Sequence, residues 1–163
     1  IAINISVADV LNPEFLPYLI AKTKEYQLKH DCISLELTES LMASDPTKVI
    51  ANLVDIKNSG FSIAIDDFGT GYSSLSYLSD IPASTIKIDR SFVITLSSSS
   101  AKQIMCKRII QLAKDLNIDV VAEGIEDQQA LDYLKAFGCD WGQGYFISRP
   151  KEKSQIVDWY LKN

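Results

Sequence analysis

The sequence has 163 residues, of which 47% are hydrophobic, and it carries a formal net charge of −5. This apolar content is sufficient for one core of ordinary single-domain size and argues against a disordered chain. The acidic balance argues against a nucleic-acid polymer as partner, because phosphate backbones are normally met by a basic face, but it permits a small anionic ligand bridged by cations. No stretch approaches the ~18 apolar residues of a membrane helix, so we expect no membrane contact by this segment.

The cysteines and the first residue indicate the context of the chain. Cys32, Cys106 and Cys139 lack the spacing of a metal site, and we expect them to be reduced thiols in the cytoplasm. The chain begins at Ile1, inside a strand pattern and without a methionine. We therefore expect it to be part of a longer protein, whose other segments could tether it to a membrane.

Strand patterns alternate with helix patterns along the whole chain. Alternating apolar residues predict strands over residues 1–7, 33–38, 63–66, 84–89 and 119–124, and a last strand within residues 141–148. Helices are predicted from Asn12-Pro13, from Asp45-Pro46 to before Gly60, over residues 101–116, from Asp127 to before Gly138, and after Pro150. In the first of these helices, Phe15, Leu16, Leu19 and Ile20 are expected on one face. This order predicts a single α/β domain.

The two faces of the predicted strands differ in a way that indicates a barrel. One face is aliphatic, whereas the other carries small residues and one polar residue near the carboxyl end of each strand. Parallel strands with crossover helices close into a (β/α) barrel whose active groups gather at that end. The polar residues expected to converge there are Asn4, Glu36, Asp66, Lys87, Glu123 and Gln143. Any one of them alone would more simply be a barrel-filling residue, but six in matching positions favour an active site.

The stretch IAIDDFGTGYSSL, residues 63–75, is the strongest local signal. It runs from a strand into Asp66 and Asp67 and then into a loop with Gly69 and Gly71, which permit backbone conformations closed to other residues. Taken alone, two aspartates before a glycine turn are most often a solvated loop.

The chemistry of these residues points to a metal site. Three carboxylates and an asparagine oxygen, with no histidine or cysteine among them, suit Mg²⁺ or Mn²⁺ rather than zinc. Asp66 and Asp67 could bind two metals about 3.5 to 4 Å apart, and Lys87 could hold the attacking water or offset phosphate charge. The single histidine, His30, is expected to be structural or exposed. Phosphodiester hydrolysis is the reaction that this set of residues suggests.

Five motifs, LELTES, IAIDDFGTGYSSL, IKIDRSFV, VVAEGIE and GQGYFISRP, together resemble the EAL domain, the bacterial phosphodiesterase that acts on cyclic di-GMP. The resemblance spans the chain and implies a (β/α)8 TIM-like barrel. It implies metal ligation by Asn4, Glu36, Asp66 and Asp67, with Glu123 as a further ligand or a general base. It also implies that Lys87 is the catalytic lysine, that Gln143 supports the site, and that Glu39 steadies the loop after Asp67. The implied reaction opens cyclic di-GMP to linear pGpG with Mg²⁺ or Mn²⁺ and is inhibited by Ca²⁺.

The sequence departs from the family pattern in one respect. The Glu-Ala-Leu motif of the family, with its metal-binding glutamate and nearby substrate-binding arginine, is absent from residues 1–163. A complete barrel needs about 250 residues, so we expect this chain to be the C-terminal portion of a single EAL domain, with the last six β/α units present and the first two missing. On its own we expect it to be inactive and to form a homodimer or another self-associated state. The parent could be a phosphodiesterase, or a cyclic di-GMP receptor or dimerising scaffold that does not cleave its ligand.

Overall fold

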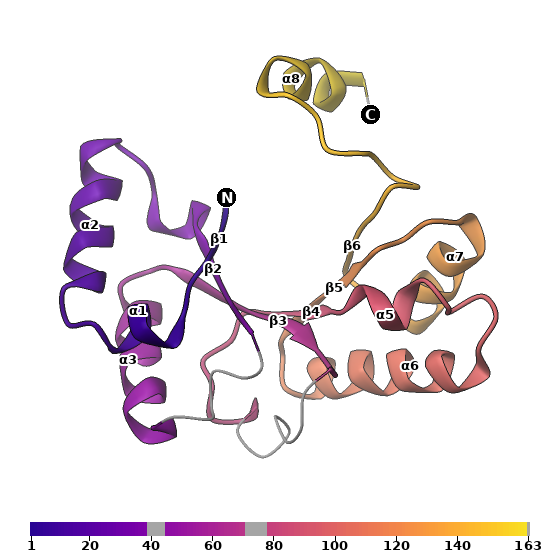
Figure 1. Cartoon of the computed structure of the whole chain (residues 1–163), viewed down its shortest axis with the longest axis horizontal. Helices are drawn as coiled ribbons and strands as arrows, with labels where there is room; N and C mark the ends of the chain where they lie inside the picture. The colour runs from indigo at the N-terminus through magenta and orange to yellow at the C-terminus, as the bar shows by residue number, and fades with distance from the viewer. Residues whose placement is uncertain (39–44, 71–77, 163) are drawn as a thin grey trace.

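The computed structural model of the protein describes residues 1–38, 45–70 and 78–162. Its strands are β1 (Ala2–Asn4), β2 (Ser34–Thr38), β3 (Ser62–Phe68), β4 (Thr85–Ile88), β5 (Asp119–Glu123) and β6 (Trp141–Gln143). Its helices are α1 (Val7–Leu11), α2 (Phe15–Glu25), the short 3₁₀ helix η1 (His30–Cys32), α3 (Pro46–Asn58), α5 (Arg90–Val93), α6 (Ser100–Asp115), α7 (Gln128–Phe137) and α8 (Lys153–Lys162). Figure 1 shows α1 to α3 beside the first strands and α5 to α7 beside the last ones.

The six strands form one sheet in sequence order, and every neighbouring pair is parallel. Parallel neighbours joined by helical crossovers are consecutive β/α units of a barrel. Because all strands run the same way, their carboxyl ends lie along one rim. The fold therefore brings residues distant in sequence to a common edge.

Strict alternation of side chains explains where the core forms. Leu35, Ile63, Ile86 and Val120 are fully buried on the sheet face that packs against the helices. The side chains between them point to the opposite face, where the polar residues lie. The aliphatic face thus supplies most of the hydrophobic stabilisation and leaves the other face for chemistry.

Local capping signals set several helix boundaries as predicted. The carboxylate of Asp45 accepts a hydrogen bond from the Lys48 N–H at the start of α3, and Asp127 does the same for Ala130 at the start of α7. Gly138 ends α7 with a left-handed backbone, φ 82°. These helices begin and end within a few residues of the expected positions.

The N-terminal region differs from the prediction. The first strand is three residues long, and α1 follows because Ser6 and Asp9 form a reciprocal capping box. Asn12 consequently ends α1 instead of starting the next helix, and α2 begins only at Phe15. The expected apolar face of α2 was also wrong in one position, because Ile20 is 38% exposed.

His30 has a structural role, since its ring stacks on Phe61 with centroids 4.4 Å apart and Nδ1 lies 2.6 Å from the Ser59 carbonyl oxygen. Helix α8, yellow in Figure 1, stands away from the sheet at the end of an extended segment, and four of its large hydrophobic side chains, Ile156, Val157, Tyr160 and Leu161, are exposed. Within the described ranges, no helix combines the length and the hydropathy needed to cross a membrane.

Candidate active site

The centre of the polar rim is the amino group of Lys87, on β4. Its Nζ atom lies 2.9 Å from Glu36 Oε2, 3.1 Å from Asp66 Oδ1 and 2.8 Å from Glu123 Oε1. These carboxylates come from the neighbouring strands β2, β3 and β5. The convergence expected from the sequence is therefore observed for these four residues.

Burial and charge set the protonation of Lys87. The residue is 9% exposed, and burial by itself would lower the pKa of its amino group. Hydrogen bonds to Glu123, Glu36 and Asp66 outweigh that effect, and the net pKa is raised above the usual value. Lys87 is thus a fixed positive charge at neutral pH.

Glu123 is held from two sides. Oε1 accepts hydrogen bonds from Lys87 and, at 2.8 Å, from the amide Nε2 of Gln143 on β6, the residue paired with Glu123 in the strand register. Burial raises the pKa of the Glu123 carboxyl above its ordinary value, and the Lys87 charge only partly opposes this. A carboxylate with a raised pKa is a better proton acceptor near neutral pH.

Strand β3 contains an irregularity that the sequence analysis missed. Ile65 pairs with Ile86, but Phe68 pairs with Ile88, so three steps along β3 match two along β4. The extra residue is a β-bulge at Asp66 and Asp67, and Asp67 has a positive φ of 53°. The strand therefore does not end at Asp66, as predicted, but resumes and buries Phe68 in the core.

The bulge keeps Asp67 close to other acids. The Asp67 N–H donates to Asp66 Oδ1 at 3.0 Å. Burial, followed by the negative charges of Asp66 and Asp89, raises the pKa of the Asp67 carboxyl. Sequence reasoning placed Asp89 in a strand but did not assign it to the site; its position two residues after Lys87 was the available signal.

The other predicted residues lie at the end of β1 or outside the described residues. Asn4 pairs with Glu36 in the strand register and its side chain is exposed at the end of β1. Glu39 and Gly71 lie outside the described residues. The ligand roles of Asn4, Glu36, Asp66 and Asp67 stay predictions.

The oxygen atoms of the rim side chains are of the type that binds a hard cation, but they are arranged around the amino group of Lys87. Over residues 1–38, 45–70 and 78–162, no three acidic, histidine or cysteine side chains are grouped as a metal site. Instead, Lys87 lies where the carboxylates of Glu36, Asp66 and Glu123 meet. All-oxygen donors of this kind suit Mg²⁺ or Mn²⁺.

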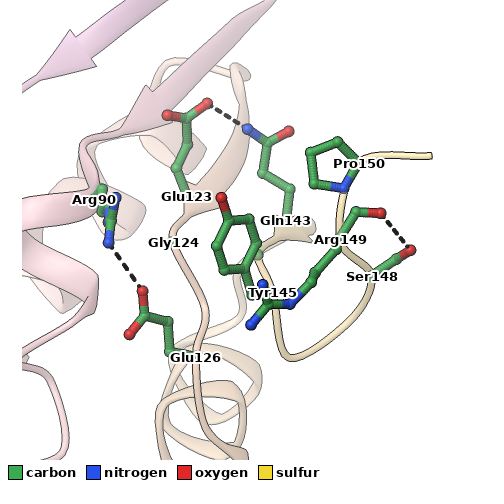
Figure 2. Close-up of a pocket in the computed structure, with 10 residues that line it drawn as sticks. Arg90, Glu123, Gly124, Glu126, Gln143, Tyr145, Ser148, Arg149 and Pro150 are labelled. Carbon is green, nitrogen blue, oxygen red and sulfur yellow. Dashed lines mark hydrogen bonds and ion pairs between the residues drawn. The ribbon is translucent and has the colours of Figure 1, made fainter. Parts of the chain in front are cut away.

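A cavity of about 390 Å³ opens beside Glu123 and Gln143, as Figure 2 shows. Arg90 and Glu126 form an ion pair of 3.1 Å on one wall, and the guanidinium of Arg149 lies 4.8 Å from the Tyr145 ring centroid on another. The motifs containing these four residues were recognised in the sequence, but their convergence was not. It depends on loops from three different strands meeting.

The fold and the rim together define a class: a parallel β/α barrel domain with a lysine and acidic side chains gathered at the carboxyl ends of its strands, where barrel enzymes carry their active sites. The family model of the EAL domain matches residues 1–150. The chain belongs to the EAL domain family, which confirms the resemblance seen in its motifs.

Individual relatives support this assignment. The cyclic di-GMP phosphodiesterase PA2567 of Pseudomonas aeruginosa is 40% identical over 159 residues, which are 98% of this chain and 27% of that protein. This chain therefore spans only about a quarter of the relative's length.

Solved structures confirm the TIM-like barrel fold. The EAL domain of Mycobacterium smegmatis DcpA matches with a TM-score of 0.93 and 36% identity, covering 99% of this chain and 72% of that one. Klebsiella pneumoniae BlrP1, solved in complexes of cyclic di-GMP with manganese or with calcium, matches with a TM-score of 0.85 and 31% identity, covering 91% of this chain and 38% of that one.

Proposed function

We propose that this chain is part of a metal-dependent phosphodiesterase that opens cyclic di-GMP to linear pGpG. The observation that carries the proposal is the amino group of Lys87 held among the carboxylates of Glu36, Asp66 and Glu123. A related phosphodiesterase at 40% identity supports the choice of substrate.

Asn4, Glu36, Asp66 and Asp67 are the residues we propose to hold Mg²⁺ or Mn²⁺, with Glu123 as a further ligand or as the proton acceptor. The bound cations would polarise a phosphoryl oxygen and lower the pKa of water, and a two-metal arrangement is the version we favour. Relatives solved with manganese or calcium support the use of divalent cations. We further propose that Ca²⁺ inhibits.

The chain's own residues would then act as follows. Water attacks phosphorus, Glu123 can accept the water proton, and the bond from phosphorus to the 3′ oxygen breaks. The 3′ oxygen takes up a proton from solvent as it leaves and becomes a hydroxyl, and the phosphate stays on the 5′ side of the linear product. Lys87 offsets the charge that develops on the phosphate, and Gln143 orients Glu123. We propose that Glu39 steadies the loop after Asp67.

The adjoining cavity offers a place for another part of the dinucleotide. Arg149 and the ion-paired Arg90 supply guanidinium groups that can contact phosphate, and Tyr145 presents a half-exposed ring, with Arg149 over one face, whose other face could stack on a base. In Figure 2 the side chains of Arg90, Tyr145 and Arg149 lie around the space beside Glu123. We propose that this cavity binds the half of cyclic di-GMP remote from the scissile phosphate.

We also propose that two further β/α units complete the barrel in the intact protein, and that the 163-residue chain alone is inactive and self-associates. The sheet has β1 and β6 at its edges, and unpaired edges favour pairing with another chain. Cytoplasmic location is proposed as well, supported by Cys32, Cys106 and Cys139, all of which are free thiols.

The test is an assay of the complete protein with cyclic di-GMP, run with Mn²⁺, with Mg²⁺ and with chelator, with the products separated by chromatography. We expect pGpG to form with either metal and not with chelator. Tight binding of intact cyclic di-GMP without cleavage would instead establish a receptor. Neither binding nor cleavage would reject both functions.

A further inference from the structure

The turn that follows β3 carries Asp67 and has an unusual backbone. Asp67 and Gly69 both have positive φ, 53° and 96°. The Asp67 carbonyl oxygen accepts hydrogen bonds from the Thr70 N–H at 3.3 Å and from Thr70 Oγ1 at 2.8 Å. A non-glycine residue in this region is strained, and such a conformation persists only where the surroundings hold it.

Phe92, on α5, lies directly against this turn. An added Cβ on Gly69 would be 3.0 Å from Phe92 Cζ and 3.1 Å from Cε2, closer than ordinary van der Waals contact. The Phe92 side chain is 7% exposed, and Lys102 Nζ lies 3.9 Å from its ring centroid. Burial and the contact with Lys102 hold the Phe92 ring in place, so that it supports the Gly69 backbone.

Helix α5 contacts the turn a second time through its N-cap. The carboxylate of Asp89 accepts a hydrogen bond from the Ser91 N–H at 2.9 Å, which fixes its orientation, and its charge acts on Asp67. Because β4 leads directly into α5, Lys87 and Phe92 belong to one continuous segment. The segment that carries the central lysine also supports the turn that carries Asp67.

We propose that Phe92 is a positioning residue for the Asp67 turn. Its ring holds the Gly69 backbone in place and thereby sets how well Asp67 and Asp66 bind a divalent cation. This proposal rests on the proposed function for its consequence, cation affinity, but the structural support can be measured independently.

The experiment compares Phe92→Leu with Phe61→Leu in the complete protein. Phe61 is also buried and stacks on His30 near the opposite end of β3, and its substitution removes the same kind of ring. In the absence of metal, we expect faster hydrogen exchange of the Thr70 amide in Phe92→Leu and no change in Phe61→Leu. Equal exchange in the two variants overturns the proposal, whether or not the protein hydrolyses cyclic di-GMP.

A second arm measures Mn²⁺ binding by calorimetry. Phe92→Leu should weaken it by about tenfold, because the turn that carries Asp67 loses its support, whereas Phe61→Leu should leave it unchanged. Equal affinities of the two variants overturn the proposal. If Phe92→Leu fails to fold, Phe92→Met preserves an apolar side chain and replaces it in both arms.

The outcomes separate the two hypotheses. A wild-type protein that neither cleaves nor binds cyclic di-GMP contradicts the proposed function, and the exchange of the Thr70 amide still decides the role of Phe92. An active wild type whose Thr70 exchange is insensitive to Phe92→Leu contradicts only the role of Phe92.

Discussion

Lys87 Nζ and Glu123 Oε1 lie 2.8 Å apart across the neighbouring strands β4 and β5. Their side chains are only 11% and 17% exposed, so the interaction is weakly screened by water. The pKa of Lys87 is raised by its carboxylate partners despite burial, and burial raises the pKa of Glu123. The pair combines a permanent cation with a carboxylate suited to accept a proton.

Lys87→Met should destabilise the protein in a pH-dependent way. Without the cation, the carboxylates of Glu36, Asp66 and Glu123 repel one another, and the pKa of Glu123, already raised by burial, rises further because the lowering effect of Lys87 is lost. A raised folded pKa contributes stability at low pH that is lost as pH rises, so the loss should be larger at pH 7.5 than at pH 4.5. We expect about 3 kcal/mol at the higher pH, measured by urea unfolding with chelator.

The control for that variant is Lys22→Met. The Lys22 ion pair with Glu25 is about half exposed and should contribute less than about 1 kcal/mol. Equal losses from Lys87→Met and Lys22→Met, or a Lys87→Met loss independent of pH, would show that the central cluster is not electrostatically coupled as described.

Asp66→Asn should reduce phosphodiesterase turnover of the complete protein by orders of magnitude while folding survives, because the change removes an anionic oxygen at nearly constant shape. Asp119→Asn is the matched control, since Asp119 is the exposed first residue of β5, at the end of the strand opposite to the rim. The measurement is the Mg²⁺-dependent rate together with the thermal midpoint. Near-normal hydrolysis by Asp66→Asn would reject its assignment as a metal ligand.

Gly144→Ala should unfold the region around the cavity. A Cβ at Gly144 would overlap the backbone nitrogen, carbon and oxygen of Ile125, which cannot move without disturbing the loop after β5. We expect a loss of at least about 2 kcal/mol in the free energy of unfolding. At Gly142 the closest atom to an added Cβ is Cδ1 of the Ile125 side chain, at 2.6 Å, and the nearest backbone atom is 4.0 Å away, so Gly142→Ala should cost less. A Gly144→Ala variant as stable as wild type would contradict the close packing described.

The 163-residue chain by itself should self-associate and show little or no hydrolysis of cyclic di-GMP even with Mn²⁺. Its sheet has β1 and β6 as edges, and the side chains of Ile1 and Trp141 at these edges are 79% and 65% exposed. Light scattering and the chromatographic assay are the measurements. A well-folded monomer with the turnover of the complete protein would disprove both parts of this prediction.

The amino-acid sequence by itself determined the features that depend on near neighbours. Alternation in β5 put Val120 and Ala122 in the core, and the caps at Asp45 and Asp127 started their helices, because periodicity and capping act over a few residues. The barrel prediction and the grouping of Glu36, Asp66, Lys87 and Glu123 also followed, since parallel strands align their carboxyl ends. Asn12 was misassigned because the short helix α1, which begins at the Ser6–Asp9 capping box and ends at Asn12, was not predicted.

Only the tertiary structure decided the features that depend on contacts between distant segments. The bulge at Asp66 and Asp67 adds one residue to β3, so that the buried Phe68 pairs with Ile88 on the neighbouring strand. The ring of Phe92 meets Gly69 only once α5 is packed beside the turn. Strand pattern predicts which face a side chain takes, but these contacts arise from close packing between elements, whose geometry no local pattern contains.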